Sequence, residues 1–327
     1  MDYLIFFTSF ISIVVLGYLL AEGSDNIGIF IGRRFSGRII LSITSELPEF
    51  LIVVYSVILN IPDIGLGAIF GSNILMMSLG LAVFILASTT RFSLKPIQAI
   101  NLNKFKNDII VFLLLSIIIP ITYIDGYGIF DAIIFLLAYS LYLYLTAKER
   151  KIEVFEMDSK SKRKINKKIL YLSSLFVAIG AIGLIFVSET FTSSLNSIAI
   201  SIGIPAIVLT LVVSPLAAEM PEKVSLIFLA RKGGESIDTM IGTIFGSKIL
   251  NSSLLITMFI VLHSLIFGSK ISFDYIGFLE ALLSMLVAII ATILMIDRKV
   301  TKIEGIILLL VYVFVIIFQF ILLYIIH

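Results

Sequence analysis

Four glutamates occur as two pairs within otherwise apolar stretches. The motif Glu46-Leu-Pro-Glu49 recurs later in the chain as Glu219-Met-Pro-Glu222. A spacing of three residues places both carboxylates of a pair on one face of a helix, and the intervening proline removes a backbone donor and frees a carbonyl oxygen. Hard cations such as calcium, sodium and magnesium prefer carboxylate and carbonyl oxygens as ligands. The pairs therefore predict a metal-cation site.

Two lysines in apolar stretches of the second half, Lys223 and Lys248, offer an alternative. They could pair with the glutamates as buried ion pairs that serve only structure. Such pairs would neutralise two of the four carboxylates and leave two negative charges, and no lysine stands in the apolar stretches of the first half. We therefore favour a cation site over purely structural ion pairs.

Hydroxyl and amide side chains near the glutamates can add further oxygen ligands. These are Ser45, Ser72, Asn73, Ser247 and Asn251. Serine and asparagine in membrane helices also serve as hydrogen-bond partners between helices, so both interpretations stay open for the set as a whole. For Ser72 and Ser247, a position within a repeated motif favours ligation.

The repeated motif is Gly67-Ala-Ile-Phe-Gly-Ser-Asn-Ile-Leu75, which recurs as Gly242-Thr-Ile-Phe-Gly-Ser-Lys-Ile-Leu250. Seven of its nine positions match at an offset of 175, and the glutamate motif recurs at an offset of 173. Two motifs in the same order at nearly the same offset indicate that the two halves of the chain are duplicates.

The apolar stretches themselves have the length of membrane spans. The chain is 59% hydrophobic and 14% charged, with a mean hydropathy of +1.14. Runs of about 20 apolar residues cross a hydrocarbon layer of ~30 Å as helices. We predict an all-α membrane protein with ten transmembrane helices near 3–21, 39–59, 64–87, 108–124, 127–147, 169–188, 203–229, 239–262, 274–296 and 303–326.

Several functional classes are excluded by what the sequence lacks. There is no cysteine, which rules out thiolate metal sites and disulfides. A net charge of +2 does not suggest nucleic acid as a partner, and no phosphate-binding glycine loop or histidine motif is present. We expect no enzyme and no cofactor; the expected partners are metal cations and the lipid bilayer.

Basic residues are distributed very unevenly among the loops. The odd-numbered loops carry 21 lysines and arginines, nine of them in 148–168, whereas the even-numbered loops carry only Lys270. Under the positive-inside rule, this predicts a multi-pass protein of the cell membrane with both termini outside and 148–168 cytoplasmic. The domains are then a first five-helix repeat, 1–147, the basic linker 148–168, and a second five-helix repeat, 169–327. Because each half has an odd number of spans, the repeats are inverted, with a site near the midplane.

These motifs resemble the cation/calcium antiporter superfamily, which includes the sodium/calcium exchangers. In that superfamily each repeat has a G-T-S-L-P-E segment and a G-S-N segment. Ser45-Glu-Leu-Pro-Glu49 and Gly71-Ser-Asn73 match them in the first half, Glu219-Met-Pro-Glu222 and Gly246-Ser-Lys248 in the second, and Gly23-Ser-Asp25 resembles the turn after the first span.

The resemblance implies particular roles for these residues. Glu49 and Glu222 would be the central acidic ligands, and Ser45, Ser72 and Ser247 would supply oxygens to flanking ion positions. It also implies alternating access, in which spans 1 and 6 slide against the remaining core.

The chain departs from the superfamily at the site itself. Glu46 and Glu219 stand where exchangers usually have serine, Lys248 replaces the asparagine of G-S-N, Met76 replaces an Asn or Asp, and Ala218 replaces a threonine. Carboxylates are gained and neutral ligands are lost. We hypothesise that Lys248 acts as a tethered cation or charge partner in an ion position.

The leading interpretation is a secondary active transporter that exchanges calcium or another divalent cation for sodium or protons. One alternative is a proton-coupled cation exchanger with altered specificity, because like-charge pairs such as Glu46 and Glu49 favour proton binding. Another is a non-transporting ion-sensing or scaffold membrane protein whose site is closed by Lys248. Ion-dependent thermal stabilisation and flux measurements distinguish these alternatives.

Overall fold

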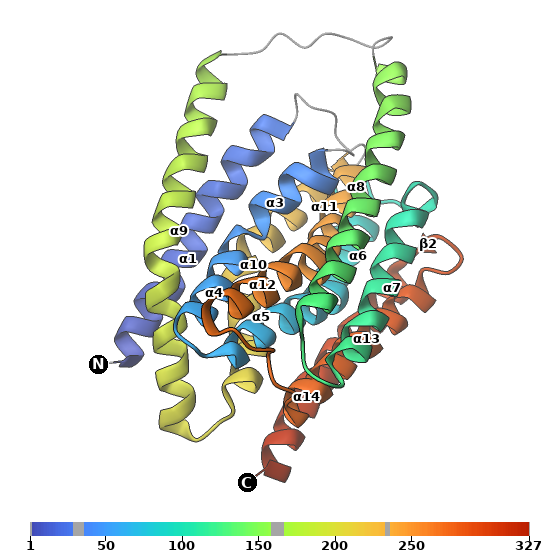
Figure 1. Cartoon of the computed structure of the whole chain (residues 1–327). Coiled ribbons are helices and arrows are strands. Elements are labelled where there is room, and N and C mark those ends of the chain that lie inside the picture. Colours follow the sequence, from blue (N-terminus) through green and yellow to red (C-terminus); the bar gives the residue numbers. More distant parts are fainter. Residues whose placement is uncertain (1, 29–35, 158–166, 233–235, 327) are drawn as a thin grey trace.

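The computed structural model describes residues 2–28, 36–157, 167–232 and 236–326. Within these ranges the regular secondary structure is helical apart from one pair of two-residue strands, and the helices lie side by side in a bundle (Figure 1). The centre of the predicted linker, 158–166, lies outside the described residues. Its first part continues a helix as far as Met157, and its last residues begin the next helix at Lys167.

The helices of the first half follow the predicted spans closely. They are α1 (Asp2–Gly28), η1 (Ser36–Leu41), α3 (Ser42–Ser45), α4 (Leu47–Ile58), α5 (Pro62–Leu75), η2 (Met76–Gly80), α6 (Leu81–Thr89), the short η3 (Asn103–Phe105), α7 (Lys106–Tyr123) and α8 (Ile129–Met157). The elements η1 and η2 are π-helical.

The second half has a similar order of elements. They are α9 (Lys167–Ile202), α10 (Ala206–Lys232), α11 (Ser236–Leu250), the π-helical η4 (Asn251–Leu255), α12 (Ile256–Phe267), α13 (Tyr275–Leu294) and α14 (Lys302–Ile326). The strands β1 (Ile100–Asn101) and β2 (Lys299–Val300) pair antiparallel, with Ile100 opposite Val300.

Eight helices in the described part of the chain are long and apolar enough to cross a membrane. They correspond to all the predicted spans except 39–59 and 203–229. The first of these is interrupted, because the chain passes from η1 and α3 into α4 at Glu46. The second, α10, carries Glu219, Glu222 and Lys223. These two segments are the ones that carry the glutamate pairs, so charged side chains interrupt their apolar sequence.

Three helices continue well beyond the predicted spans, α1 to Gly28, α8 to Met157 and α9 to Ile202, and packing contacts accompany two of these extensions. The segment Gly23-Ser-Asp25, expected as a turn, lies inside α1. A Cβ on Gly23 would lie 2.6 Å from the Ser173 carbonyl oxygen, so this glycine allows α1 and α9 to approach closely. Helix α9 continues well beyond residue 188, to Ile202. Phe191 in this extension is buried and stacks on Phe6 with ring centroids 5.7 Å apart.

The duplicated motif has the same local structure in both halves. Each copy is followed by a π-helix, η2 or η4, a feature often found at functional sites. A Cβ on Gly71 would lie 2.2 Å from the carbonyl oxygen of Leu211, and one on Gly246 would lie 2.4 Å from that of Arg38. Leu211 and Arg38 are themselves 173 residues apart. Each motif helix thus packs through a glycine on the glutamate-bearing segment of the other half.

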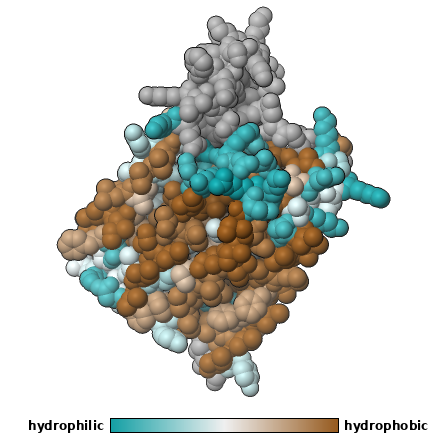
Figure 2. All heavy atoms as spheres, turned by 90° about the vertical axis from the view of Figure 1, so that its right-hand side faces the viewer, coloured by the Kyte–Doolittle hydropathy of each residue, from teal (hydrophilic) through white to brown (hydrophobic). Residues whose placement is uncertain are grey.

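The outer surface is apolar over a broad belt (Figure 2). Figure 2 shows hydrophobic residues across most of the visible face, with hydrophilic residues gathered toward the upper edge of this belt. Large apolar side chains of α8 and α14 are more than half exposed, for example Leu137, Leu141, Phe314 and Phe320. Such a belt suits contact with lipid. By contrast, α5 is buried throughout from Ile64 to Leu75 and forms the centre of the bundle.

Candidate cation site

The two glutamate pairs meet in the interior of the bundle. Glu46 lies at the junction of α3 and α4, Glu49 in the first turn of α4, and Glu219 in α10. Carboxylate oxygens of these three residues lie within 4.8 Å of one another. Their exposed fractions are 0–1%, and that of Glu222 is 6%. The structure therefore brings together acidic residues that are separated by more than 170 positions in the chain.

Prolines shape the backbone on both sides of this cluster. Pro48 stands at the start of α4, where its missing N–H leaves no helical bond unmade. Pro221 stands inside α10, so the carbonyl of Ala217, four residues earlier, has no intrahelical N–H partner. The proline thus frees the Ala217 carbonyl oxygen from its usual helical hydrogen bond, in the turn that precedes Glu219 and Glu222.

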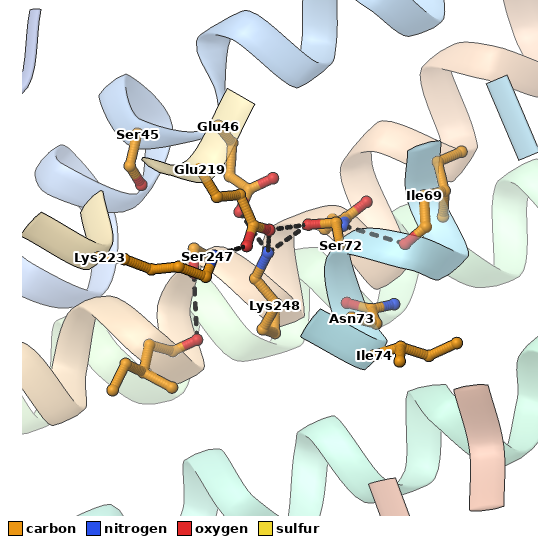
Figure 3. A network of polar contacts seen from close by, with 12 residues as sticks. Ser45, Glu46, Ile69, Ser72, Asn73, Ile74, Glu219, Lys223, Ser247 and Lys248 are labelled. Carbon is orange, nitrogen blue, oxygen red and sulfur yellow. Dashed lines mark hydrogen bonds and ion pairs between the residues drawn. The ribbon is translucent and has the colours of Figure 1, made fainter. Parts of the chain in front are cut away.

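Lys248 occupies the centre of the acidic cluster (Figure 3). Its Nζ lies 2.8 Å from Glu46 Oε1 and 2.6 Å from Glu219 Oε1, and it donates a hydrogen bond to the Ser72 hydroxyl. The Ser72 hydroxyl in turn donates to Glu219. This lysine is completely buried, and both halves of the chain contribute its partners. It cross-links the glutamate-bearing segments through their charges.

Glu219 has a second cation beside it. Lys223 Nζ lies 2.6 Å from Glu219 Oε2, one helical turn away on α10. The side chain of Lys223 is itself 8% exposed, so this ion pair is largely shielded from solvent. Glu219 is therefore engaged through both carboxylate oxygens.

Glu49 and Glu222 differ from their neighbours. In the described part of the structure, Glu46 and Glu219 form ion pairs with lysine, whereas neither Glu49 nor Glu222 has an ion pair or a hydrogen-bond partner, and both are buried. Four carboxylates against two lysines leave two negative charges if all are ionised. A buried charge without a partner is very costly, so this pair of carboxylates requires a cation or protons.

The serines and asparagines divide into two groups. Ser72 belongs to the charged network, while Ser45 and Ser247 donate to carbonyls three residues earlier, Ser42 at 3.2 Å and Ile244 at 3.1 Å. A hydroxyl that donates in this way keeps its oxygen available as an acceptor. The serines therefore remain compatible with ion ligation.

The two asparagines form contacts between the halves instead. Asn73 Nδ2 donates to Ser252 Oγ at 2.9 Å, and Asn251 Nδ2 donates to the Ile69 carbonyl at 3.3 Å. In Figure 3, Asn73 lies away from the contacts around Lys248. The structure does not bring these two residues into the lysine-centred network, although their amide oxygens have no partner among the described residues.

A cavity of about 30 Å³ adjoins the site, with room for a water-sized group. Its lining includes Ser45 and Glu222 together with residues from the last part of α1 and the first turns of α11. Gly17 of α1 covers the prolines: a Cβ there would lie 3.0 Å from Pro221 Cγ and 3.8 Å from Pro48 Cγ. The cavity thus lies between Glu222 and the end of the bundle where α1 finishes.

A sequence profile described as sodium/calcium exchanger protein matches residues 1–148 and 172–321. The chain belongs to the sodium/calcium exchanger family. This membership confirms the resemblance noted from the motifs, and the chain is a multi-pass membrane protein of an exchanger family rather than an enzyme.

Individual relatives agree with this assignment. An uncharacterized membrane protein of Methanocaldococcus jannaschii is 28% identical over 214 residues, which make up 65% of this chain and 65% of that protein. A crystal structure of the H⁺/Ca²⁺ exchanger CAX superposes with a TM-score of 0.80 at 18% identity, covering 99% of this chain and 85% of CAX. The sodium-calcium exchanger NCX_Mj superposes with a TM-score of 0.66 at 20% identity, covering 96% and 97%. The chain therefore has the fold of exchanger-family proteins.

The structure also reveals buried charges that the sequence analysis of this exchanger-family chain missed. Arg38, which was counted as a loop cation, is 4% exposed and lies 2.5 Å from Asp108 Oδ2. Glu280, inside the predicted span 274–296, is completely buried and was not singled out. A carboxylate within an apolar run was the signal that could have identified Glu280.

Proposed function

We propose that this protein is a secondary active transporter that exchanges a metal cation, calcium or another divalent ion, for sodium or protons by alternating access. The observation that carries the proposal is the pair Glu49 and Glu222, buried beside a lysine-bound acidic cluster with no donors of their own. The names of CAX and NCX_Mj specify calcium with protons or sodium, and the proposal extends these ion classes to this chain.

The ligands have separate roles in this proposal. Glu49 and Glu222 bind the transported ion, assisted by Ser45 and Ser247. Glu46 and Glu219, with Ser72, hold Lys248 as a fixed cation inside the site. Asn73 and Asn251 form hydrogen bonds between the two halves. Their amide oxygens have no partner among the described residues and could act as additional ligands.

We further propose ten spans in two inverted five-helix repeats, 1–147 and 169–327. Contacts between loops support the alternation. The strands β1 and β2 join the loops after the third and ninth predicted spans, and Lys104 lies 2.6 Å from Asp238 in the loop after the seventh. On the even side, Lys270 lies 2.9 Å from Asp125. In each of these contacts, an odd-numbered loop touches an odd-numbered loop or an even-numbered loop touches an even-numbered one. In addition, α1 begins at the same end of the bundle at which α14 ends (Figure 1).

The charge distribution predicts that the linker is cytoplasmic. A cysteine introduced at Ser159, which lies outside the described residues, would be the only cysteine in the protein. We expect an impermeant thiol reagent to label it in inverted vesicles but not in intact cells. A cysteine at Ser269, in an even-numbered loop, serves as the control with the opposite expectation. Labelling of the Ser159 variant in intact cells would contradict the orientation.

Purified protein tests the function directly. In proteoliposomes loaded with sodium or at an acid internal pH, we expect uptake of a radioactive divalent cation that collapses when the counter-ion gradient is removed. Thermal stabilisation by the same cation should accompany it, because an ion that binds only the folded state raises its stability. Stabilisation without flux would identify an ion sensor, and the absence of both for calcium, magnesium, manganese, sodium and protons would identify a scaffold.

A further inference from the structure

Glu280 and Gln319 form a buried polar pair outside the candidate cation site. Glu280 lies on α13 and Gln319 on α14, with exposed fractions of 0% and 4%. Gln319 Nε2 donates a hydrogen bond to Glu280 Oε2 at 2.9 Å. Both helices are long and apolar enough to cross a membrane. An ionised carboxylate at such a place, with a single neutral donor, would be strongly disfavoured.

The remaining oxygens of the pair carry the argument. Among the described residues, Glu280 Oε1 and Gln319 Oε1 have no hydrogen-bond partner, although both are buried. A carboxylate oxygen and an amide oxygen are both acceptors and cannot bond to each other. One proton on Glu280 Oε1 supplies the donor that Gln319 Oε1 lacks, and it also removes the buried charge.

Among the described side chains, no charged group of the surrounding helices pairs with Glu280. The elements packed against α13 are α5, α7, η2, α10 and α14. η2 has no acidic or basic residue. The described charged side chains of the other four helices are Asp63 (α5), Lys106 and Asp108 (α7), Glu219, Glu222 and Lys223 (α10), and Lys302 and Glu304 (α14). None of these, and no tyrosine of α7 or α14, forms an ion pair or a hydrogen bond with Glu280, whose partner is Gln319.

We propose that Glu280 and Gln319 form a proton-binding site, in which Glu280 is a neutral carboxylic acid paired with the Gln319 side-chain amide. The acid O–H donates to the amide oxygen, and the amide N–H donates to the acid carbonyl. Binding forms one O–H bond on Glu280, with the proton taken from a hydronium ion of the solvent, which becomes water. The site is separate from the glutamates around Lys248 and does not depend on what they transport.

Infrared spectroscopy of the purified protein at neutral pH tests this proposal. Glu280→Gln should remove one carbonyl-stretch component of a protonated carboxylic acid, whereas Asp297→Asn, at an exposed position, should leave that region unchanged. Because glutamine is neutral and can donate to Gln319 Oε1, the variant should keep its Tm within a few degrees. Loss of a carboxylate band instead, with the acid region unchanged, would overturn the proposal.

A second variant gives a result that does not depend on Glu280→Gln folding. Gln319→Leu removes the amide and leaves the acid without its hydrogen bonds, so the acid band should move to higher frequency. An acid band that does not move in Gln319→Leu would also overturn the pairing. Neither measurement involves ion flux, so failure here and failure of the proposed transport function are distinguishable.

Discussion

Replacing Glu49 or Glu222 by glutamine is expected to abolish cation flux while leaving a folded protein. Each substitution removes one negative charge from a site whose cation must be balanced by carboxylates. It also removes a buried carboxylate that has no hydrogen-bond partner among the described residues. Because a buried charge without a partner costs more than a buried neutral amide, the ion-free variants should be as stable as the original protein or more stable.

Flux and thermal stability measured together check this expectation. The matched control is Glu189→Gln, the same chemical change at an exposed position of α9, which should leave both flux and ion-dependent stabilisation unchanged. The informative pattern is loss of ion-dependent stabilisation with an unchanged or raised Tm in the absence of ions. Normal flux in Glu49→Gln and in Glu222→Gln would contradict the assignment of these residues as ion ligands.

Much of the fold could be predicted because hydropathy is a local property. Each predicted span coincides with a helical segment, since about 20 apolar residues can satisfy their backbone in lipid only as a helix. The repeated motif is also evident in the sequence, and the structure gives both copies a glycine contact and a π-helix. Each motif helix packs on the glutamate-bearing segment of the opposite half, and this packing accompanies the meeting of Glu46, Glu49 and Glu219.

What the sequence did not predict depends on contacts between distant segments. Counting basic residues cannot tell a solvated arginine from Arg38, whose charge is met by Asp108 seventy positions away. The continuation of α9 to Ile202 depends on burial of Phe191 against α1, which no local pattern indicates. Asn73 adjoins Ser72 in the first motif copy, and Asn251 directly follows the second copy. Both asparagines nevertheless contact the other half of the chain rather than the lysine.

The sequence also did not predict which carboxylates Lys248 contacts. A lysine has a flexible stem of four carbons, so the packing of the helices decides which carboxylates it reaches. The structure places it between Glu46 and Glu219, the two glutamates that replace serine if the motifs are matched to the superfamily by their resemblance. The additional carboxylates and the lysine thus occur together, which supports the hypothesis that they form a single unit within the site.

Lys248→Asn, which restores the residue found at Asn73 in the other motif copy, is therefore expected to create or strengthen sodium dependence. Removing one partner of a buried ion pair costs about 3–5 kcal/mol, because Glu46 loses its cation and Glu219 keeps only Lys223. The variant should be clearly less stable without ions, and sodium should restore stability by binding where the ammonium group was. Saturation at about 100 times the dissociation constant would return ~2.7 kcal/mol.

The measurement is flux against a sodium gradient at clamped membrane potential, together with Tm as a function of sodium concentration. Lys270→Asn is the control, because it removes a lysine from an exposed ion pair with Asp125 and should change neither quantity. If Lys248 occupies an ion position, its replacement must change both the sodium dependence and the charge moved per cycle. The reason is that the lysine ammonium group stays in the protein during transport, whereas a sodium ion bound in its place is released. Identical sodium dependence and identical charge movement in the original protein and in Lys248→Asn would mean that Lys248 serves only as a structural partner of Glu46 and Glu219.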